Sequence, residues 1–252
     1  QREDGYHLMD MIMQPISLFD EISVEPDDTL TLTVSGDPLI PPDEHHLALR
    51  AARLLKETFG ISTGAHLHVH KQIPAQAGLG GGSADAAGVL IALRQLWNLP
   101  CTLDRLCSLA VPLGADIPFC LTGGLQRVKG IGQSLSPIDA SLFCSLLVIK
   151  PCEGLSTQAV FSAYHESGHA CPDNLDALEK NAVQDCIECG CCLYSCPANI
   201  PLLCARMSGS GSACFGVFPA SFDLDAIEHL ALKRFGFARK VLTQKVSVQR
   251  IA

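Results

Sequence analysis

The sequence predicts a mixed α+β protein with two domains. Three observations support this: short segments of alternating apolar and polar residues, longer segments with apolar residues at helical spacing, and glycine-rich stretches between them. The chain of 252 residues, 48% of them hydrophobic, can bury a substantial core. Its longest apolar runs stop far short of the roughly 20 residues that a membrane-spanning helix needs. The formal charge of −8 argues against a general nucleic-acid surface, which depends on clustered Lys and Arg.

The first half of the chain alternates strands and helices. Apolar residues occur at every second position in the predicted strands and at helical spacing in the predicted helices, and turn-forming residues lie between these elements. Gly60 is expected to end the first helix, a glycine run precedes the second, and Thr102 is expected to cap the third. We therefore predict strands at 30–34 and 65–70 and helices at 44–59, 83–97 and 102–110.

A short apolar strand at 143–149 ends at Lys150-Pro151 and marks the start of the second half. We place the domain boundary here, which divides the chain into residues 1–142 and 143–252. Beyond a polar stretch and a cysteine-rich segment, the same patterns predict a strand at 213–218, a helix at 223–235 and a closing strand at 240–248.

Three histidines, His66, His68 and His70, alternate along one predicted strand and share one of its faces. Such a row can bind a metal ion, but the sequence places no carboxylate or Cys near it to complete a ligand set. An exposed polar strand face is the better interpretation.

A glycine-rich loop joins a predicted strand to the second predicted helix. Glycine allows positive φ angles and a close approach of the backbone to a ligand, and the helix start directs free N–H groups at an anion. Taken alone, such a loop is also compatible with a tight turn. The spacing fits neither a P-loop nor a dinucleotide fingerprint. The candidate phosphate-binding residues are Pro74, Ala75, Gln76, Ala77, Gly78, Leu79, Gly80, Gly81, Gly82, Ser83 and Ala84.

The loop resembles the ATP-binding motif of the GHMP kinases, and more closely that of the 4-diphosphocytidyl-2-C-methyl-D-erythritol kinases of the non-mevalonate (MEP) isoprenoid pathway. Four further stretches resemble motifs of the same family: 2–7 with 16–20, 114–119, 130–132 and 206–213. The resemblance implies an N-terminal domain like domain 2 of ribosomal protein S5 and a ferredoxin-like α/β sandwich at the C-terminus.

The resemblance also implies an ATP- and Mg²⁺-dependent kinase that phosphorylates a hydroxyl of 4-diphosphocytidyl-2-C-methyl-D-erythritol. Asp116 would be the catalytic residue, although from the residues alone this acid could simply cap a turn. Tyr6, His7 and Thr157 would contact the cytidine-linked substrate. A second glycine loop would pair with the first across the cleft, and it comprises Ser208, Gly209, Ser210, Gly211 and Ser212. We expect a cytoplasmic monomer or homodimer whose partner is this small molecule, with no nucleic acid or membrane partner.

Two features depart from the family. The family's first strand carries a catalytic lysine, and no equivalent precedes Gln1, so the first strand is apparently missing and we expect reduced activity. Six of the 13 cysteines lie between Cys186 and Cys204. Four of them, Cys186, Cys189, Cys192 and Cys196, have the spacing of a bacterial ferredoxin run that binds a [4Fe–4S] cluster.

This cysteine segment resembles the ferredoxin-like segments of the membrane redox-complex subunit RnfC. It is either a genuine cluster site or a foreign segment spliced into a kinase. The alternative function is therefore an iron–sulfur electron-transfer module on an inactive kinase-like scaffold. The other cysteines are scattered in mostly apolar contexts, which favours a reducing cytoplasm.

Overall fold

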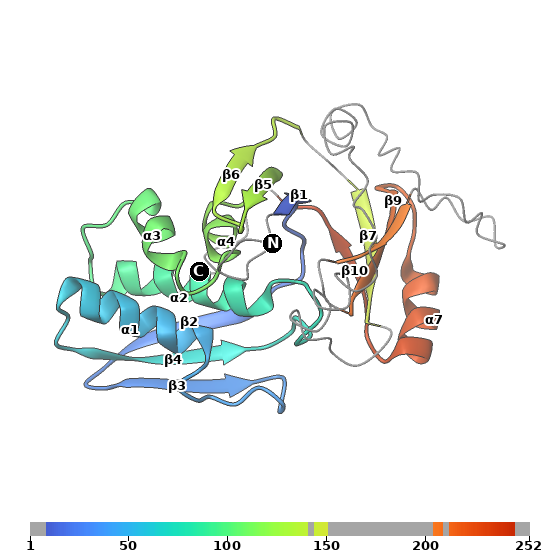
Figure 1. Ribbon diagram of the computed structural model, residues 1–252. Helices are drawn as coiled ribbons and strands as arrows, with labels where there is room; N and C mark the ends of the chain where they lie inside the picture. The colour runs from blue at the N-terminus through green and yellow to red at the C-terminus, as the bar shows by residue number, and fades with distance from the viewer. Residues whose placement is uncertain (1–8, 141–143, 151–203, 209–211, 245–252) are drawn as a thin grey trace, which may run out of the picture.

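The computed structural model describes residues 9–140, 144–150, 204–208 and 212–244. These residues form three β-sheets and five α-helices (Figure 1). Two sheets and four of the helices lie in the first half of the chain, and the third sheet lies in the second half with one helix. This mixed architecture confirms the predicted α+β class. No helix among the described residues is long and apolar enough to cross a membrane.

The first sheet is built from β2 (Glu21–Asp27), β3 (Leu30–Ser35) and β4 (Gly64–His70), in the order β2-β4-β3. β2 is antiparallel to β4, whereas β3 is parallel to β4 and reaches it through helix α1 (Leu47–Phe59). The ring of His46 accepts a hydrogen bond from the backbone N–H of Ala48 and so caps the helix start. Gly60 ends the helix with φ of 63°, as its position predicts.

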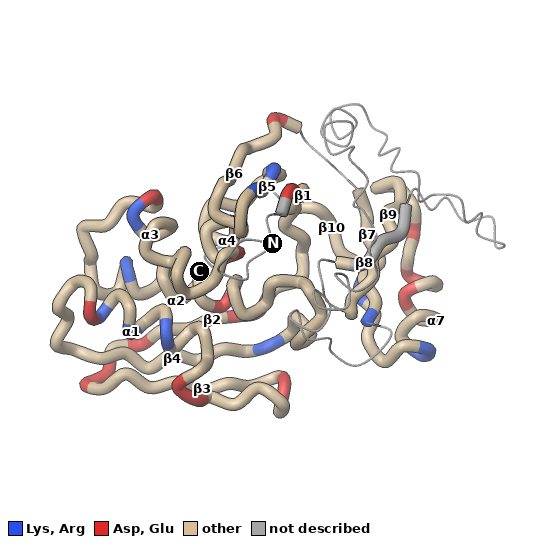
Figure 2. The backbone as a smooth tube through the Cα atoms, in the orientation of Figure 1, with Lys and Arg blue, Asp and Glu red and all other residues tan. Residues whose placement is uncertain are grey.

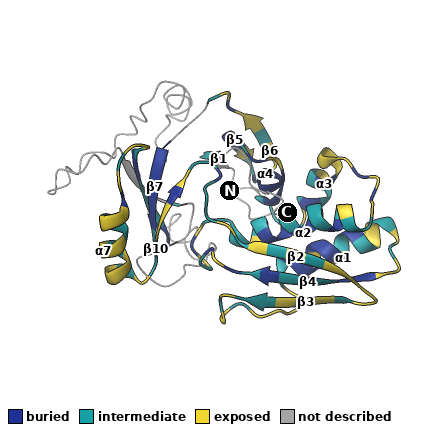
Figure 3. Cartoon of the chain, turned by 180° about the vertical axis from the view of Figure 1, so that it is seen from behind, coloured by how far each residue is buried: buried dark blue, intermediate teal, exposed yellow. Residues whose placement is uncertain are grey.

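Helix α2 (Gly81–Leu96) lies at the centre of the first half, between α1, α4 and β2. Thr102 caps α3 (Leu103–Ala110), as predicted, and α4 (Ile117–Thr122) follows it. The apolar faces of these helices and of β4 form one continuous core (Figure 3). Its fully buried members include Leu55, Leu67, Leu90, Leu93 and Ile117. The predicted helices are confirmed, although α1 and α2 begin at Leu47 and Gly81 rather than at 44 and 83.

A second sheet, in the order β1-β5-β6, consists of β1 (Met9–Met13), β5 (Gln126–Gly130) and β6 (Ser134–Pro137). All of its pairings are antiparallel. β1 pairs with β5, which lies more than one hundred positions later in the chain. None of these strands was predicted. β5 and β6 are short and carry few β-branched residues, which leaves little local signal.

The third sheet contains β7 (Cys144–Ile149), β8 (Cys204–Met207), β9 (Cys214–Pro219) and β10 (Ala238–Leu242). Its strands are all antiparallel and lie in the order β10-β7-β9-β8. If the four strands are numbered 1 to 4 along the chain, this order is 4-1-3-2, which is that of a ferredoxin-like sheet. Leu147 and Phe218 pack on one face with residues around α7 (Asp225–Phe235). Leu146 and Val148 on the opposite face pack with Ala77 of the glycine-rich loop.

The predicted closing strand, 240–248, is corrected by the structure. β10 begins at Ala238, and after Leu242 the chain turns to pair with the N-terminal segment. Thr243 forms a bridge with Ile16, and the N–H of Gln244 donates to the carbonyl of Pro15. Residues 245–248 lie outside the described residues. These contacts join the two halves, so the division into domains at residue 142 stays a prediction.

Candidate active site

The glycine-rich loop links the end of β4 to α2, and its backbone conformation alternates. Gln76, Gly78 and Gly80 have positive φ angles of 51°, 69° and 70°. Alternation of left-handed with other conformations turns successive N–H groups towards one side, forming an anion-binding nest. Among the described residues, the N–H groups from Gly78 to Ser83 have no hydrogen-bond acceptor. The loop therefore presents a row of free donors.

This row of donors continues into the first turn of α2. The N-cap residue, Gly80, has no side chain to satisfy the N–H groups of that turn, and the helix dipole adds positive potential there. The segment 72–84 contains no charged residue, and Figure 2 shows this loop without charged positions. Anion binding here would therefore depend on the backbone, as is typical of phosphate-binding loops.

Asp116 occupies the N-cap position of α4, but its side chain makes no capping hydrogen bond. The carboxylate is half-buried, and burial raises its pKa above the ordinary value. Its side chain therefore does not serve as a simple cap. A half-buried carboxylate with a raised pKa is a stronger base than an exposed one, which suits it to accept a proton.

The turn that carries Asp116 packs against the start of α2. A Cβ added to Gly114 would lie 3.7 Å from the hydroxyl oxygen of Ser83, and one added to Gly132 would collide with Ala115. The two glycines thus allow the turn that carries Asp116 to approach both the glycine-rich loop and the β5–β6 turn. The structure therefore brings together three motifs singled out in the sequence: the glycine-rich loop and the stretches 114–119 and 130–132.

Beneath the loop lies a buried cluster of one cation and two anions. The ammonium of Lys71 donates to Oδ2 of Asp85 at 2.7 Å and to Oδ2 of Asp20. All three side chains are at most 4% exposed. Oδ1 of Asp20 accepts from the backbone N–H groups of Gln72 and Ile73, at 2.6 and 2.8 Å. The cluster ties the start of β2, the end of β4 and the first turns of α2 together below the glycine-rich loop.

Asp85 has a strongly shifted pKa. Burial is the largest cause and raises its pKa to about 7, while the nearby Lys71 ammonium acts in the opposite direction. Burial prevails because one ammonium is shared by two carboxylates, and Oδ1 of Asp85 has no partner among the described residues. Burial also raises the pKa of the Cys120 thiol to about 12, with Asp116 and Asp85 adding to the effect, so this thiol stays protonated.

The raised pKa of Asp85 predicts a pH dependence of stability. An unfolded Asp85 ionises near 3.8, whereas the folded one holds its proton to about 7, so folding binds a proton between these values. Stability from this group is therefore present at low pH and lost as the pH rises through about 7. Urea unfolding of the wild type and Asp85→Asn at pH 5 and pH 8 checks this. Between pH 5 and pH 8, the free energy of unfolding of the wild type should fall by about 1–3 kcal/mol more than that of the variant. The same fall in both proteins would contradict the prediction.

The row of histidines on β4 lies on the outer face of the first sheet. Each ring bonds to hydroxyl groups of β3: His66 to Thr31 and Thr33, His68 to Thr33 and Ser35, and His70 to Ser35, at 2.8–3.2 Å. Among the described residues no group of three His, Cys, Asp or Glu side chains is arranged to hold a metal ion. The histidines form a polar ladder along the strand face.

Ser208 and Ser212 are the first and last residues of the second glycine loop, and both contact the first loop. Their hydroxyls donate to the carbonyls of Gly78, at 2.7 Å, and Gln76, at 3.4 Å. Several predicted site residues lie outside the described residues: Tyr6, His7, Thr157, Gly209, Ser210, Gly211, Cys186, Cys189, Cys192 and Cys196. Their roles stay predictions.

Sequence reasoning gave no individual role to Lys71, Asp20 or Asp85, although Asp20 ends the stretch 16–20 that resembles a family motif. The three residues are far apart in sequence and meet only through the packing of β2, β4 and α2. Lys71 and Asp20 are charged residues next to strands and Asp85 is a charged residue in a helix, and such residues are common on protein surfaces.

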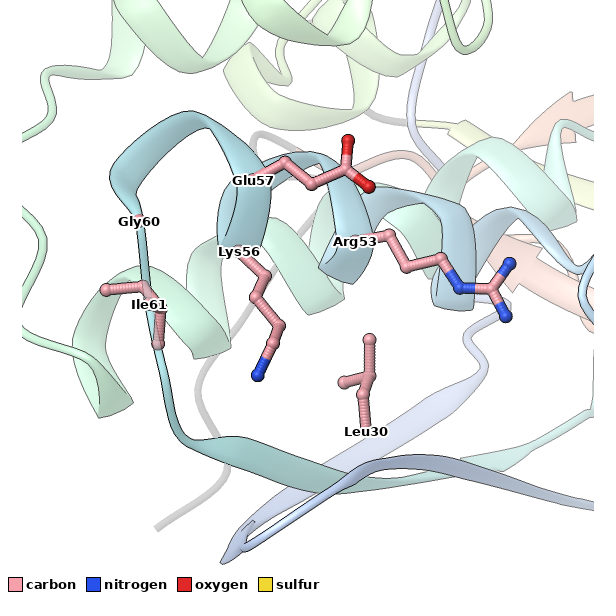
Figure 4. Close-up of a pocket in the computed structure, with 6 residues that line it drawn as sticks. All are labelled: Leu30, Arg53, Lys56, Glu57, Gly60 and Ile61. Atoms are coloured by element: carbon pink, nitrogen blue, oxygen red, sulfur yellow. The ribbon is translucent and has the colours of Figure 1, made fainter.

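A hollow between α1 and the start of β3 lies apart from these groups. Figure 4 shows that residues of α1 and of the chain just after it form most of its wall. The ammonium of Lys56 donates to the carbonyls of Ser62 and Thr63, so it serves the helix end. The lining residues are Leu30, Arg53, Lys56, Glu57, Gly60 and Ile61.

The loop and its surroundings match proteins of known family. Residues 46–124 match the family model described as GHMP kinases N terminal domain. A relative from Clostridium botulinum, named 4-diphosphocytidyl-2-C-methyl-D-erythritol kinase, is 41% identical over 164 residues, which cover 65% of this chain and 59% of the relative. A relative of the same name from Caldicellulosiruptor bescii is 35% identical over 252 residues, which cover 91% of this chain and 88% of the relative.

The chain belongs to the GHMP kinase family. The crystal structure of a 4-(cytidine 5'-diphospho)-2C-methyl-D-erythritol kinase has the same fold, with a TM-score of 0.76 and 30% identity. That similarity covers 96% of this GHMP kinase and 92% of the solved chain. These relatives are all named kinases, which gives no support to the iron–sulfur alternative.

Proposed function

We propose that this GHMP kinase transfers the γ-phosphate of ATP to a hydroxyl group of 4-diphosphocytidyl-2-C-methyl-D-erythritol. The observation that carries the proposal is the packing of the Asp116 turn against Ser83, where the row of free N–H groups ends. This arrangement supports a role for the loop N–H groups in binding phosphate and a role for the neighbouring Asp116 carboxylate in accepting a proton. The names of the relatives support this choice of substrate.

The chemistry follows from these groups. The phosphates of ATP bind the N–H groups from Gly78 to Ser83, which fixes the γ-phosphorus near Asp116. Asp116 accepts the proton of the substrate hydroxyl as that oxygen forms a bond to phosphorus. The bond between the γ-phosphorus and the bridging oxygen breaks, and ADP leaves with the electron pair. The raised pKa of Asp116 brings its basicity closer to that needed at neutral pH.

The site also suits the Mg²⁺ that accompanies ATP in such kinases. Mg²⁺ prefers hard oxygen ligands, and the Ser83 hydroxyl and the Asp116 carboxylate are oxygen donors on segments that pack together. We propose the Ser83 hydroxyl as its protein ligand or as a partner of its bound waters, which leaves the Asp116 carboxylate free to accept a proton. When bound, the ion neutralises charge on the phosphates.

The substrate side of the site is proposed from the family motifs. Tyr6 and His7 would pack on and hydrogen-bond the cytidine group, and Thr157 would add a further contact. The remaining parts of the proposal are a cytoplasmic location, no nucleic-acid partner and a monomeric or homodimeric state.

A coupled assay of ADP release tests the proposal. The full chain is incubated with ATP, Mg²⁺ and 4-diphosphocytidyl-2-C-methyl-D-erythritol, and the phosphorylated product is identified by mass spectrometry. ADP release that depends on this acceptor supports the proposal. Homoserine and mevalonate, the substrates of other GHMP kinases, serve as controls. Turnover of either control in preference to the cytidine compound, or no acceptor-dependent turnover, would contradict it.

A further inference from the structure

The carbonyl side of the phosphate loop is held by the second half of the chain. Four consecutive carbonyl oxygens, those of residues 75–78, each accept a hydrogen bond from that half. The donors are the ammonium of Lys150 to Ala75 at 3.0 Å, the hydroxyl of Ser212 to Gln76 at 3.4 Å, the N–H of Ala213 to Ala77 at 3.1 Å, and the hydroxyl of Ser208 to Gly78 at 2.7 Å. Figure 1 shows the loop between β4 and α2 extending towards this sheet.

These bonds favour the loop conformation that exposes its N–H groups. In a nest, the carbonyls point away from the side that the N–H groups face, so donors on the carbonyl side stabilise that arrangement. The effect matters most at Gln76, a non-glycine residue with φ of 51°, because a left-handed conformation costs about 1–2 kcal/mol for such a residue. The second half thus supports the loop opposite to the free donors.

Lys150 is the charged member of this set. It directly follows β7, and its N–H donates to the carbonyl of Phe237, at 3.2 Å, so its backbone is fixed to the sheet. Its side chain is part-buried, and no carboxylate in the described part of the chain forms an ion pair with it. A charged donor to a carbonyl makes a stronger hydrogen bond than a neutral one. Lys150 thus anchors the loop at Ala75, where the four-carbonyl run begins.

We propose that Lys150 is a positioning residue for the phosphate loop: its bond to the Ala75 carbonyl holds the loop so that its N–H groups converge on the phosphates of the nucleotide. This inference rests on the proposed ATP-dependent function. Lys150 acts through the loop backbone, so its loss should affect the nucleotide and not the acceptor.

The test compares Lys150→Met with Lys150→Arg and Lys150→Gln. Calorimetry gives the Kd for ATP with Mg²⁺, and steady-state assays give separate KM values for ATP and acceptor. Lys150→Met should raise the Kd and KM for ATP by about tenfold to a hundredfold, and leave the KM for the acceptor within about twofold. Lys150→Arg should restore most of the affinity, because it keeps a charged donor. Lys150→Gln should be intermediate, because its amide donates without charge.

Lys240→Met is the matched control, because Lys240 lies on β10 of the same sheet but pairs with Asp225. It should leave ATP affinity unchanged.

If the wild type binds ATP and Lys150→Met binds it equally well, the inference is wrong while the proposed function stands. An equal rise in both KM values would also contradict positioning of the nucleotide. If the wild type does not bind ATP, the proposed function and the inference fail together. Lys150→Arg and Lys150→Gln decide the matter if Lys150→Met does not fold.

Discussion

Replacing Asp116 with Asn is expected to lower kcat by a factor of about 10²–10⁴, with little change in the KM for ATP. The amide has nearly the same shape as the carboxylate but cannot accept the proton of the substrate hydroxyl. Because the Asp116 side chain makes no capping hydrogen bond, the change should leave the fold intact. ADP release under saturating ATP and acceptor measures kcat, and thermal unfolding checks the fold.

Asp104→Asn is a suitable control for this experiment, since Asp104 is an exposed acid in the first turn of α3. It should keep wild-type kcat. The pH profile gives a second check. Burial raises the pKa of Asp116, so the apparent pKa of the acidic limb of kcat/KM should lie above the ordinary range of an aspartate. Asp116 would not be the base if Asp116→Asn kept more than a tenth of wild-type kcat and the same acidic limb.

Replacing Lys71 with Met is expected to lower the free energy of unfolding by about 3–5 kcal/mol. Lys71 neutralises two carboxylates in a site closed to water, and its removal leaves Asp20 and Asp85 buried without a countercharge. The loss should be smaller at pH 5 than at pH 8, because Asp85, whose pKa is raised to about 7, then holds a proton. Urea unfolding at both values measures the difference.

Lys129→Met is the matched control for Lys71→Met. Lys129 is half-exposed, and its ammonium lies 3.7 Å from Asp10, so its loss should cost no more than about 1 kcal/mol. In the double variant Lys71→Met with Asp85→Asn, the loss should be less than the sum of the single losses, because the second change removes a buried charge. Equal losses for Lys71→Met and Lys129→Met would show that the buried cluster contributes little.

The parts of the site that were predicted from sequence have local chemical patterns. The glycine run before α2 indicates positive φ angles and a helix start in adjacent residues, and both are found between Gly78 and Ser83. The apolar residues beside Asp116 likewise indicated partial burial, which the structure confirms. In each case the pattern spans only a few residues, so no long-range contact was needed to recognise it.

The supporting groups could not be predicted in this way. Lys71 is separated by 51 positions from Asp20 and by 14 from Asp85, and Lys150 is separated by 75 from Ala75. Their roles arise from tertiary packing, which has no local signature in a single sequence. The strands that were missed include β1, β5 and β6, and the cause is the same: β1 pairs with β5, which lies more than one hundred positions later in the chain. The side chains of Asp10 and Arg127, 117 positions apart, are hydrogen-bonded across these two strands.

The sheet of the second half has a consequence for how this GHMP kinase responds to ligands. A bound anion would act on the N–H side of the loop, while the sheet acts on its carbonyl side. The carbonyls of Ala77 and Gly78 belong to the same peptide groups as the free N–H groups of Gly78 and Leu79. Nucleotide affinity and the docking of the second half are therefore reciprocally linked, because each stabilises the conformation that the other requires. A nucleotide that binds tightly must protect the second half from unfolding. Undocking that half must lower the affinity for the nucleotide by the same factor by which the nucleotide favours docking.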